Sequence, residues 1–493
     1  MRVLLVAAAA AMAAVCGSQP SLAATQAQAA DEAEDLFAAY DASLYAGKYD
    51  EALTYASLLS ADDGDRSERA RVLGMRGAAL LGLKQPDESA RLFAQADALA
   101  PQEPYPTKLR FRIALLTGNV GVAADSMDRM IARFPDVARE IEWQTLVFFL
   151  SKVSKSEARR NEDRLIALAR LGYGADSDTG DEIAQQAVAA LVKRGDVAGA
   201  QDLLRYIDEP GAVQTLLVQK RYAALWPALE ERAGPHLQKV IASSVSNAER
   251  AYAADPSDPE KLALLVEAYR GSGRLDDAIA LRSKLPATFV NARIQTGWAA
   301  NGIALALNAK GRIEEADRLF ADIIEAEHTG GTWRISMKVN RVESLIFDGQ
   351  FERALPLLEP TQAAAQKEGN PYAQQLVRRL RYCAYHRLGQ ADKASAILPE
   401  LLAKASDSPA ATIDGLLCAG RVEDAEKVAL AALADEAFEA QFVRMLHPGM
   451  LVGQRATAWS EEWNKLAARP SVAAAYKRLG RDLPDQFLVG KAP

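Results

Sequence analysis

The sequence predicts an all-α solenoid in which helical hairpins stack into a superhelix, with two sub-arrays, an irregular middle and a C-terminal capping segment. Three observations support this prediction. A glycine followed five residues later by a small residue recurs along the chain, most adjacent copies of this turn lie 31 to 40 residues apart, and apolar residues at helical spacing flank them. Because one hairpin cannot bury its apolar stripe alone, such units stack and share a core.

The stretch 301–327 is the clearest unit. It reads as two helices joined by a turn at Gly311, which can adopt positive φ at a helix end, while Ala316 lets the helices approach closely. The same two positions recur along the chain, with Lys84 and Ser89 in the second unit. The other pairs are Gly47 and Ala52, Gly118 and Ala123, Gly195 and Ala200, Gly273 and Ala278, Gly349 and Ala354, Gly389 and Ala394, and Gly420 and Ala425.

At these positions the chain resembles the tetratricopeptide repeat (TPR) family, and the second unit matches it best. That unit carries Leu73, Gly77, Leu80, Ser89, Phe93, Ala96 and Pro101 at the spacing of the family's 34-residue pattern. The resemblance covers most of 36–435, and periods of 38 and 40 residues indicate longer helices than the family norm. It implies a superhelix whose first helices line a concave groove for protein partners.

The turn spacing also predicts the domain organisation. The intervals from Gly118 to Gly195 and from Gly195 to Gly273 are double length, so each should contain a degenerate unit. We expect their helices at 141–150, 157–171, 213–219, 222–232 and 236–254. The predicted parts are a signal peptide, a linker, an N-terminal array, a degenerate junction, a C-terminal array and capping helices, at 1–23, 24–35, 36–139, 140–256, 257–435 and 436–493.

The N-terminus has the order of a secretory signal peptide. Arg2 is followed by the apolar stretch 3–15 and by the small-x-small site Ser21–Leu22–Ala23. We therefore expect an exported, periplasmic bacterial protein, in preference to a lipoprotein anchored through Cys16. No later stretch approaches 18 uninterrupted apolar residues, so no transmembrane span is expected in the mature chain.

Composition and the positions of the cysteines give further expectations about the function and the chemistry of the protein. The chain has 493 residues and a net charge of −7 without a long basic run, which argues against nucleic-acid binding. Cys383 and Cys418 fall on the first helices of adjacent units. Packed helix axes lie about 8–10 Å apart, whereas disulfide Cα atoms lie within about 7 Å. We therefore expect free, half-buried thiols there, with a disulfide between them as the alternative.

Motifs for catalysis, cofactors or metals are absent from the sequence, and its four histidines fall in different units. We predict no cofactor and no metal. The acidic stretch 176–181 lacks the Gly and Glu of a calcium loop, so we expect Thr179 or Asp181 to cap the next helix. Glu343–Ser344 and the Ser272 turn are weak enzyme signals, because each also fits an ordinary repeat position.

The remaining candidates are residues of first helices, which in the TPR resemblance line the concave groove. Mixed aromatic, amide and basic groups there suit an extended peptide or a partner helix. The two-carboxylate clamp of some family members is not expected, since Phe37 and Asp41 occupy two of its positions. The candidate partner-groove residues are Tyr45, Arg71, Tyr105, Lys108, Arg112, Trp298, Asn301, Asn308, Arg379, His386 and Arg387.

The leading hypothesis is a non-enzymatic periplasmic adaptor or scaffold that binds protein, in envelope assembly or polysaccharide secretion. One alternative is an enzyme acting on cell-wall glycan through a site in the irregular middle. Another is a subunit that stabilises a membrane complex. The sequence predicts neither the partner nor the oligomeric state.

Overall fold

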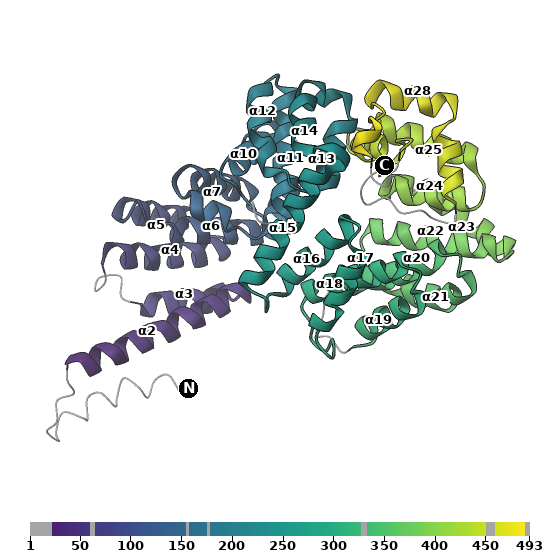
Figure 1. Cartoon of the computed structure of the whole chain (residues 1–493). Helices are drawn as coiled ribbons and strands as arrows, with labels where there is room; N and C mark the ends of the chain where they lie inside the picture. Colours follow the sequence, from purple (N-terminus) through teal and green to yellow (C-terminus); the bar gives the residue numbers. More distant parts are fainter. Residues whose placement is uncertain are drawn as a thin grey trace. The chain divides into compact units, whose positions relative to one another are not determined.

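The computed structural model describes residues 22–59, 65–153, 157–174, 178–326, 333–449 and 459–488. This part of the chain is built from helices, and its one extended pairing is an isolated bridge between Gln219 and Gly480. The chain divides into two compact units, Met1–Tyr173 and Gly174–Pro493, each described below by itself (Figure 1). None of the described helices is both long and apolar enough to span a membrane.

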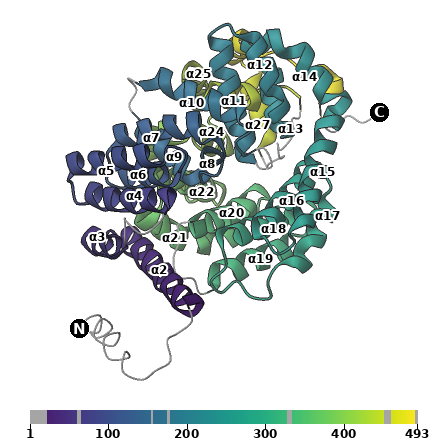
Figure 2. The ribbon, with the colours of Figure 1, turned by 90° about the vertical axis from the view of Figure 1, so that its left-hand side faces the viewer.

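The N-terminal unit is a stack of helical hairpins (Figure 2). In its first three hairpins the two helices pack together, and the first helices α4 and α6 also pack against each other. The helices are α2 (Leu22–Tyr45), α3 (Tyr49–Leu58), α4 (Arg66–Gly82), α5 (Pro86–Leu99), α6 (Tyr105–Leu116), α7 (Val120–Arg133), α8 (Pro135–Arg139), α9 (Trp143–Lys152) and α10 (Ala158–Arg170). The two helices predicted at 141–150 and 157–171 are observed as α9 and α10, although each of them packs on α7 and not chiefly on the other.

The second unit begins with helices of unequal length and continues as regular hairpins. Its first part contains α11 (Asp178–Lys193), α12 (Val197–Leu203), α13 (Pro210–Val218), α14 (Trp226–Ala233) and α15 (Gln238–Ala254). The hairpins that follow are α16 (Pro259–Gly271) with α17 (Leu275–Ala280), α18 (Ile294–Ala309) with α19 (Ile313–Glu325), α20 (Trp333–Phe347) with α21 (Phe351–Glu368), α22 (Pro371–Arg387) with α23 (Ala391–Ala403), and α24 (Pro409–Cys418) with α25 (Val422–Ala434).

The predicted turn register is confirmed throughout. All eight turn glycines have φ between 69° and 77°, and Lys84 in the corresponding place has φ 61°. At the turn between α18 and α19, the Arg312 amide donates to Leu307 O at 2.9 Å and the Gly311 amide to Asn308 O at 2.9 Å. These two bonds satisfy carbonyl groups that the end of α18 would otherwise leave free.

The small residue five positions after each turn is buried, as predicted. Ala316 is 1% exposed and lies in a core cluster with Leu307, Leu319 and Phe320. A side chain without bulk at this position lets the second helix pack closely against the first. The close packing of α18 against α19 therefore depends on the small size of the side chain at Ala316.

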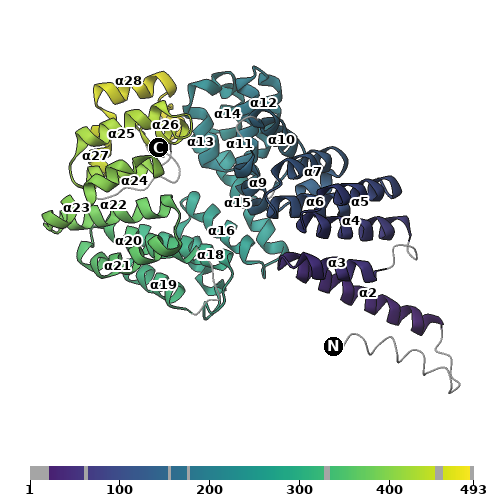
Figure 3. The ribbon, with the colours of Figure 1, turned by 180° about the vertical axis from the view of Figure 1, so that it is seen from behind.

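The C-terminal segment does more than cover the last hairpin. It contains α26 (Glu439–Met445), α27 (Ser460–Ala467) and α28 (Pro470–Leu479), and α27 and α28 pack on α25 (Figure 3). Arg481 then reaches back to the beginning of the same unit. Its amide donates to Val218 O at 2.8 Å, its Nε to Leu217 O at 2.8 Å, and its guanidinium carbon lies 3.6 Å from the centre of the Trp226 ring.

Further contacts of the C-terminal segment join the end of the second unit to its beginning. Arg481 Nη2 pairs with Glu230 at 2.8 Å, and Gln214 Nε2 donates to Phe487 O at 3.0 Å. The residues joined in this way are more than 250 positions apart in sequence. The last residues of the second unit therefore pack against α13 and α14, near the beginning of the same unit. For this reason the second unit is not an open stack of hairpins.

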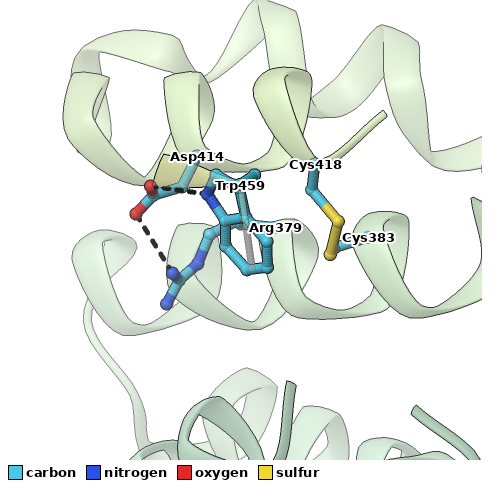
Figure 4. Close-up of a disulfide and its surroundings, with 5 residues drawn as sticks. All are labelled: Arg379, Cys383, Asp414, Cys418 and Trp459. Atoms are coloured by element: carbon cyan, nitrogen blue, oxygen red, sulfur yellow. Dashed lines mark hydrogen bonds and ion pairs between the residues drawn. A yellow bond between two sulfur atoms is a disulfide. The ribbon is translucent and has the colours of Figure 1, made fainter. Parts of the chain in front are cut away.

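Cys383 and Cys418 form a disulfide, which corrects the expectation of free thiols (Figure 4). Their Cα atoms are 5.6 Å apart, well inside the range that a disulfide needs. The expectation was wrong because it used the mean distance between helix axes. Two residues on the facing sides of α22 and α24 lie much closer together than the axes do.

The predicted linker and the predicted signal peptide have different outcomes. Residues 24–35, expected as a linker, belong to α2, which runs from Leu22 to Tyr45. The predicted signal peptide up to residue 21, including Cys16, lies outside the described residues, as do Asp176 and Ser177 of the acidic stretch.

Replacing Lys84 with Gly should stabilise the N-terminal unit by about 0.5–1 kcal/mol. The reason is that φ near +60° strains any residue with a Cβ, whereas Gly adopts it freely. Urea unfolding followed by circular dichroism measures the change. Gly311→Ala is the matched control and should destabilise by about 1 kcal/mol, since open space surrounds the added Cβ and φ alone is responsible. Equal effects of the two variants would contradict this account.

Removing the disulfide should lower the free energy of unfolding of the second unit. The 35-residue separation of its cysteines corresponds to about 3–4 kcal/mol from loop closure. Thermal unfolding with and without dithiothreitol measures the effect on the oxidised protein. The double variant Cys383→Ser/Cys418→Ser should unfold at the lower temperature under both conditions. The same unfolding temperature of the wild type with and without dithiothreitol would contradict the prediction.

Acidification should loosen the C-terminal closure through His447. Its ring is buried, burial lowers the pKa of His447, and the Leu483 amide donates to Nε2 at 2.9 Å. The neutral ring is therefore the folded form, and its stabilisation is present above the unfolded-state pKa, about 6.5. It is lost as pH falls, by up to about 1.4 kcal/mol per pH unit.

Thermal unfolding between pH 7.5 and pH 5 tests this dependence. The His447→Gln variant keeps an acceptor side chain that does not titrate, so its melting temperature should fall less over the same range. If the melting temperatures of the variant and the wild type fall equally between pH 7.5 and pH 5, His447 is not the cause of the pH dependence.

Candidate functional site

Three consecutive first helices of the N-terminal unit bring candidate groove residues together. Asp41 and Tyr45 lie one turn apart at the end of α2, and Arg71 lies on α4. Tyr105, Lys108 and Arg112 follow one another at helical spacing along α6. We call these six residues the α2–α4–α6 face. All five N-terminal residues predicted for the groove belong to it.

Arg112 links α6 to α2 at this face. Its guanidinium carbon lies 4.1 Å from the centre of the Tyr45 ring, and its Nη1 donates to the Tyr45 hydroxyl. Tyr45 nevertheless remains 47% exposed. A stacked pair of this kind offers a flat surface with a positive charge at its edge, which suits contact with an extended chain.

Asp41 lies beside this pair in a half-buried position. Burial raises the pKa of Asp41, and the charge of Arg112 opposes that rise. Asp41 therefore reduces the net positive charge of the face without forming an ion pair with Arg112. Burial also raises the pKa of Tyr105 and of Tyr45, so both phenols stay protonated and can donate hydrogen bonds.

A buried carboxylate that the sequence analysis did not single out positions the rest of the face. Glu103, 5% exposed at its side chain, pairs with Arg71 Nε at 3.1 Å and accepts the Tyr105 amide at 3.1 Å. It also accepts from the Ser67 hydroxyl on α4. Glu103 thus ties α4 to the start of α6. Its two contacts with α4 join residues 32 and 36 positions apart in sequence, so no local pattern indicates them.

The charges of this face favour an acidic partner group. Glu103 neutralises Arg71, while Arg112 binds a neutral phenol. Lys108 is exposed, and within the described residues no carboxylate pairs with it. Lys108 and Arg112 are therefore the cations with capacity for a further partner, beside hydroxyl donors from Tyr45 and Tyr105.

The candidate residues of the second unit do not gather in the same way. Trp298 is 40% exposed, and His386 and Arg387 are exposed. Asn301, Asn308 and Arg379, which the sequence analysis placed in the groove, are instead buried. The reason is that the first helix of a hairpin contacts the second helix of the same hairpin and also the first helices of the two neighbouring hairpins. Much of its surface is therefore covered. Asn301, for example, accepts from Asn340 of α20 at 2.9 Å.

Arg379 organises a buried network instead of an open surface. It pairs with Glu343 of α20. It also pairs with Asp414 of α24 at 3.2 Å (Figure 4). The indole nitrogens of Trp459 and Trp463 donate to the other oxygen of Asp414, at 3.2 and 2.9 Å. Two charged partners and two indoles therefore join α20, α22 and α24 to the C-terminal segment.

The weak enzyme signals find no support in these contacts. Glu343 pairs with Arg379, whereas its neighbour Ser344 is 4% exposed. Ser272 donates its hydroxyl to Tyr269 O at 2.9 Å. Asp181 does not cap α11, as one expectation had it, because it lies inside that helix and accepts the Asp208 and Glu209 amides at 2.6 and 3.1 Å. The side chain of Thr179, the other expected cap, lies outside the described part.

Comparison with known proteins adds little to this description. No family model matches the chain, and no curated protein matches it. Among solved structures, it is similar to the crystal structure of the P58(IPK) TPR domain at 2.5 Å, with 15% sequence identity. That match covers 82% of this chain and 100% of the other, but its TM-score of 0.20 is too low to support any conclusion. The assignment to a TPR-like solenoid rests on the hairpins themselves.

Proposed function

We propose that the chain is a non-enzymatic scaffold that binds a segment of a partner protein on the α2–α4–α6 face. The observation that carries the proposal is the cluster of Tyr45, Arg112 and Lys108 beside Asp41, on helices that repeat the same register. Repeat solenoids present extended surfaces of this kind to protein partners. A segment with an acidic side chain fits, because neither Lys108 nor Arg112 forms an ion pair with a carboxylate among the described residues, and Asp41 offsets only part of their charge.

We further propose that the protein works outside the cytoplasm, in the bacterial periplasm. The order of residues at its N-terminus supports this location, and so does the disulfide between Cys383 and Cys418, since disulfides persist in oxidising compartments. A role in envelope assembly or polysaccharide secretion would fit a scaffold there. The partner is defined here by its chemistry only.

Photo-crosslinking from Lys108 tests the binding surface. A photoreactive amino acid at this position should trap a discrete partner, because Lys108 is exposed on α6 one turn from Tyr105 and from Arg112. The matched control is the same amino acid at Arg91, which is exposed on the second helix α5. Arg112→Glu should reduce trapping from Lys108 at least tenfold, since it places a negative charge where we expect an acidic side chain.

Two results would overturn the proposal. One is the same set of crosslinked products from Lys108 and Arg91, which would indicate random collision. The other is unchanged trapping in Arg112→Glu, provided that circular dichroism shows the variant to be folded.

A further inference from the structure

The disulfide of the second unit lies beside the point where the C-terminal segment is anchored. Cys383 lies on α22 and Cys418 on α24. Arg379 and Asp414 come one helical turn earlier on the same two helices and pair at 3.2 Å (Figure 4). Because residues one turn apart lie on the same face of a helix, the disulfide and the ion pair are consecutive links between α22 and α24. We call these two links the α22–α24 seam.

Trp459 of the C-terminal segment contacts residues on both sides of this seam. Its indole Nε1 donates to Asp414 Oδ1 of α24 at 3.2 Å, and its ring packs edge-on against Phe347 of α20, with the ring centres 5.2 Å apart. Only 1% of Trp459 is exposed. A buried indole needs both apolar contacts and a partner for its N–H group. The site for Trp459 is therefore complete only while α24 keeps its position relative to α20.

The charges at the seam make a displacement of α24 costly. Arg379 is 2% exposed at its side chain and pairs with Glu343 as well as with Asp414. Moving α24 away from α22 would separate Arg379 from Asp414 and leave buried charge less well compensated. It would also separate Asp414 from Phe347, so Trp459 would lose one of its two contacts.

The disulfide restricts this displacement. Its two cysteines are 1% and 2% exposed, and their Cα atoms are 5.6 Å apart. While the bond is intact, α22 and α24 cannot separate at this point. A cross-link also removes many of the open arrangements of the chain between the two cysteines. With two thiols in its place, only packing and the ion pair hold the seam.

The last helix of the segment, α28, is held in a different way. Arg469 pairs with Glu423 at 3.4 Å and with Glu426, and the Ser471 hydroxyl also donates to Glu426. Both glutamates belong to α25, the second helix of the hairpin that contains α24. These contacts involve neither α20 nor α22. We therefore expect α28 to stay on α25 when the seam opens, whereas Trp459 and α27 depend on the seam.

We propose that the Cys383–Cys418 disulfide is a redox-sensitive lock on Trp459 and α27. In the oxidised protein the seam is closed and Trp459 is docked. A dithiol reductant breaks the S–S bond, each sulfur gains one electron and one proton, and the reductant closes to its own disulfide. The seam then opens more often, Trp459 leaves Phe347, and α27 detaches while α28 remains on α25.

Hydrogen exchange of the full chain, measured by mass spectrometry with and without dithiothreitol, tests this lock. Backbone amides of α27 should exchange about tenfold faster in the reduced protein, because local opening becomes more frequent. Amides of α28 and of α18 should keep their rates. Titration of free thiols confirms that reduction is complete, since a buried disulfide reacts slowly.

Three variants locate the effect. Cys383→Ser/Cys418→Ser should give fast exchange in α27 with and without reductant. Trp459→Leu removes the side chain that spans the seam, so α27 should exchange fast in both redox states. The matched control is Ser471→Ala, which removes a contact between α28 and α25 and should keep the redox difference at α27.

Three results would overturn the proposal. The first is equal exchange of α27 in the oxidised and the reduced wild type. The second is the same acceleration in α27, α28 and α18, which would make the disulfide a general stabiliser of the unit. The third is an unchanged redox difference in Trp459→Leu, provided that circular dichroism shows this variant to be folded.

Discussion

A left-handed turn followed by a tightly packed small residue is the constraint on which the structure of this chain depends. At Gly311 the turn ends α18 and satisfies its last carbonyl groups, and Ala316 then allows α19 to lie close against it. A hairpin made in this way still exposes an apolar stripe, so it is stable only against a neighbour. The recurrence of the same turn at φ near 70° explains how a chain of 493 residues can fold without a single large core.

The second unit departs from a simple stack because its last residues are tied to its first ones. Arg481 stacks on Trp226 and satisfies the last two carbonyl oxygens of α13. On the other side, Asp414 accepts two indoles of the C-terminal segment while it pairs with Arg379. Breaking one partner of such a buried network costs more than an exposed pair would. The tail is therefore an integral part of this unit.

The same packing rules decide where a surface remains available. In the second unit, first helices bury Asn301 and Arg379, which have the polar character of groove residues but none of the exposure. In the N-terminal unit, α2, α4 and α6 leave Tyr45 and Lys108 exposed, and Glu103 holds Arg71 in place behind them. Residue type alone does not distinguish these two situations.

Local sequence determined the helices, the turn register and the buried small residues, because these depend on contacts within about 40 residues and on the conformational freedom of single positions. It also identified the residues of the α2–α4–α6 face, since helical spacing places Tyr105, Lys108 and Arg112 on one side. Only the tertiary structure decided that Cys383 meets Cys418, that Arg379 is buried, and that Arg481 closes on Trp226. Each of these depends on which helix faces which neighbour. That choice is made by the packing of the whole unit, and no local pattern encodes it.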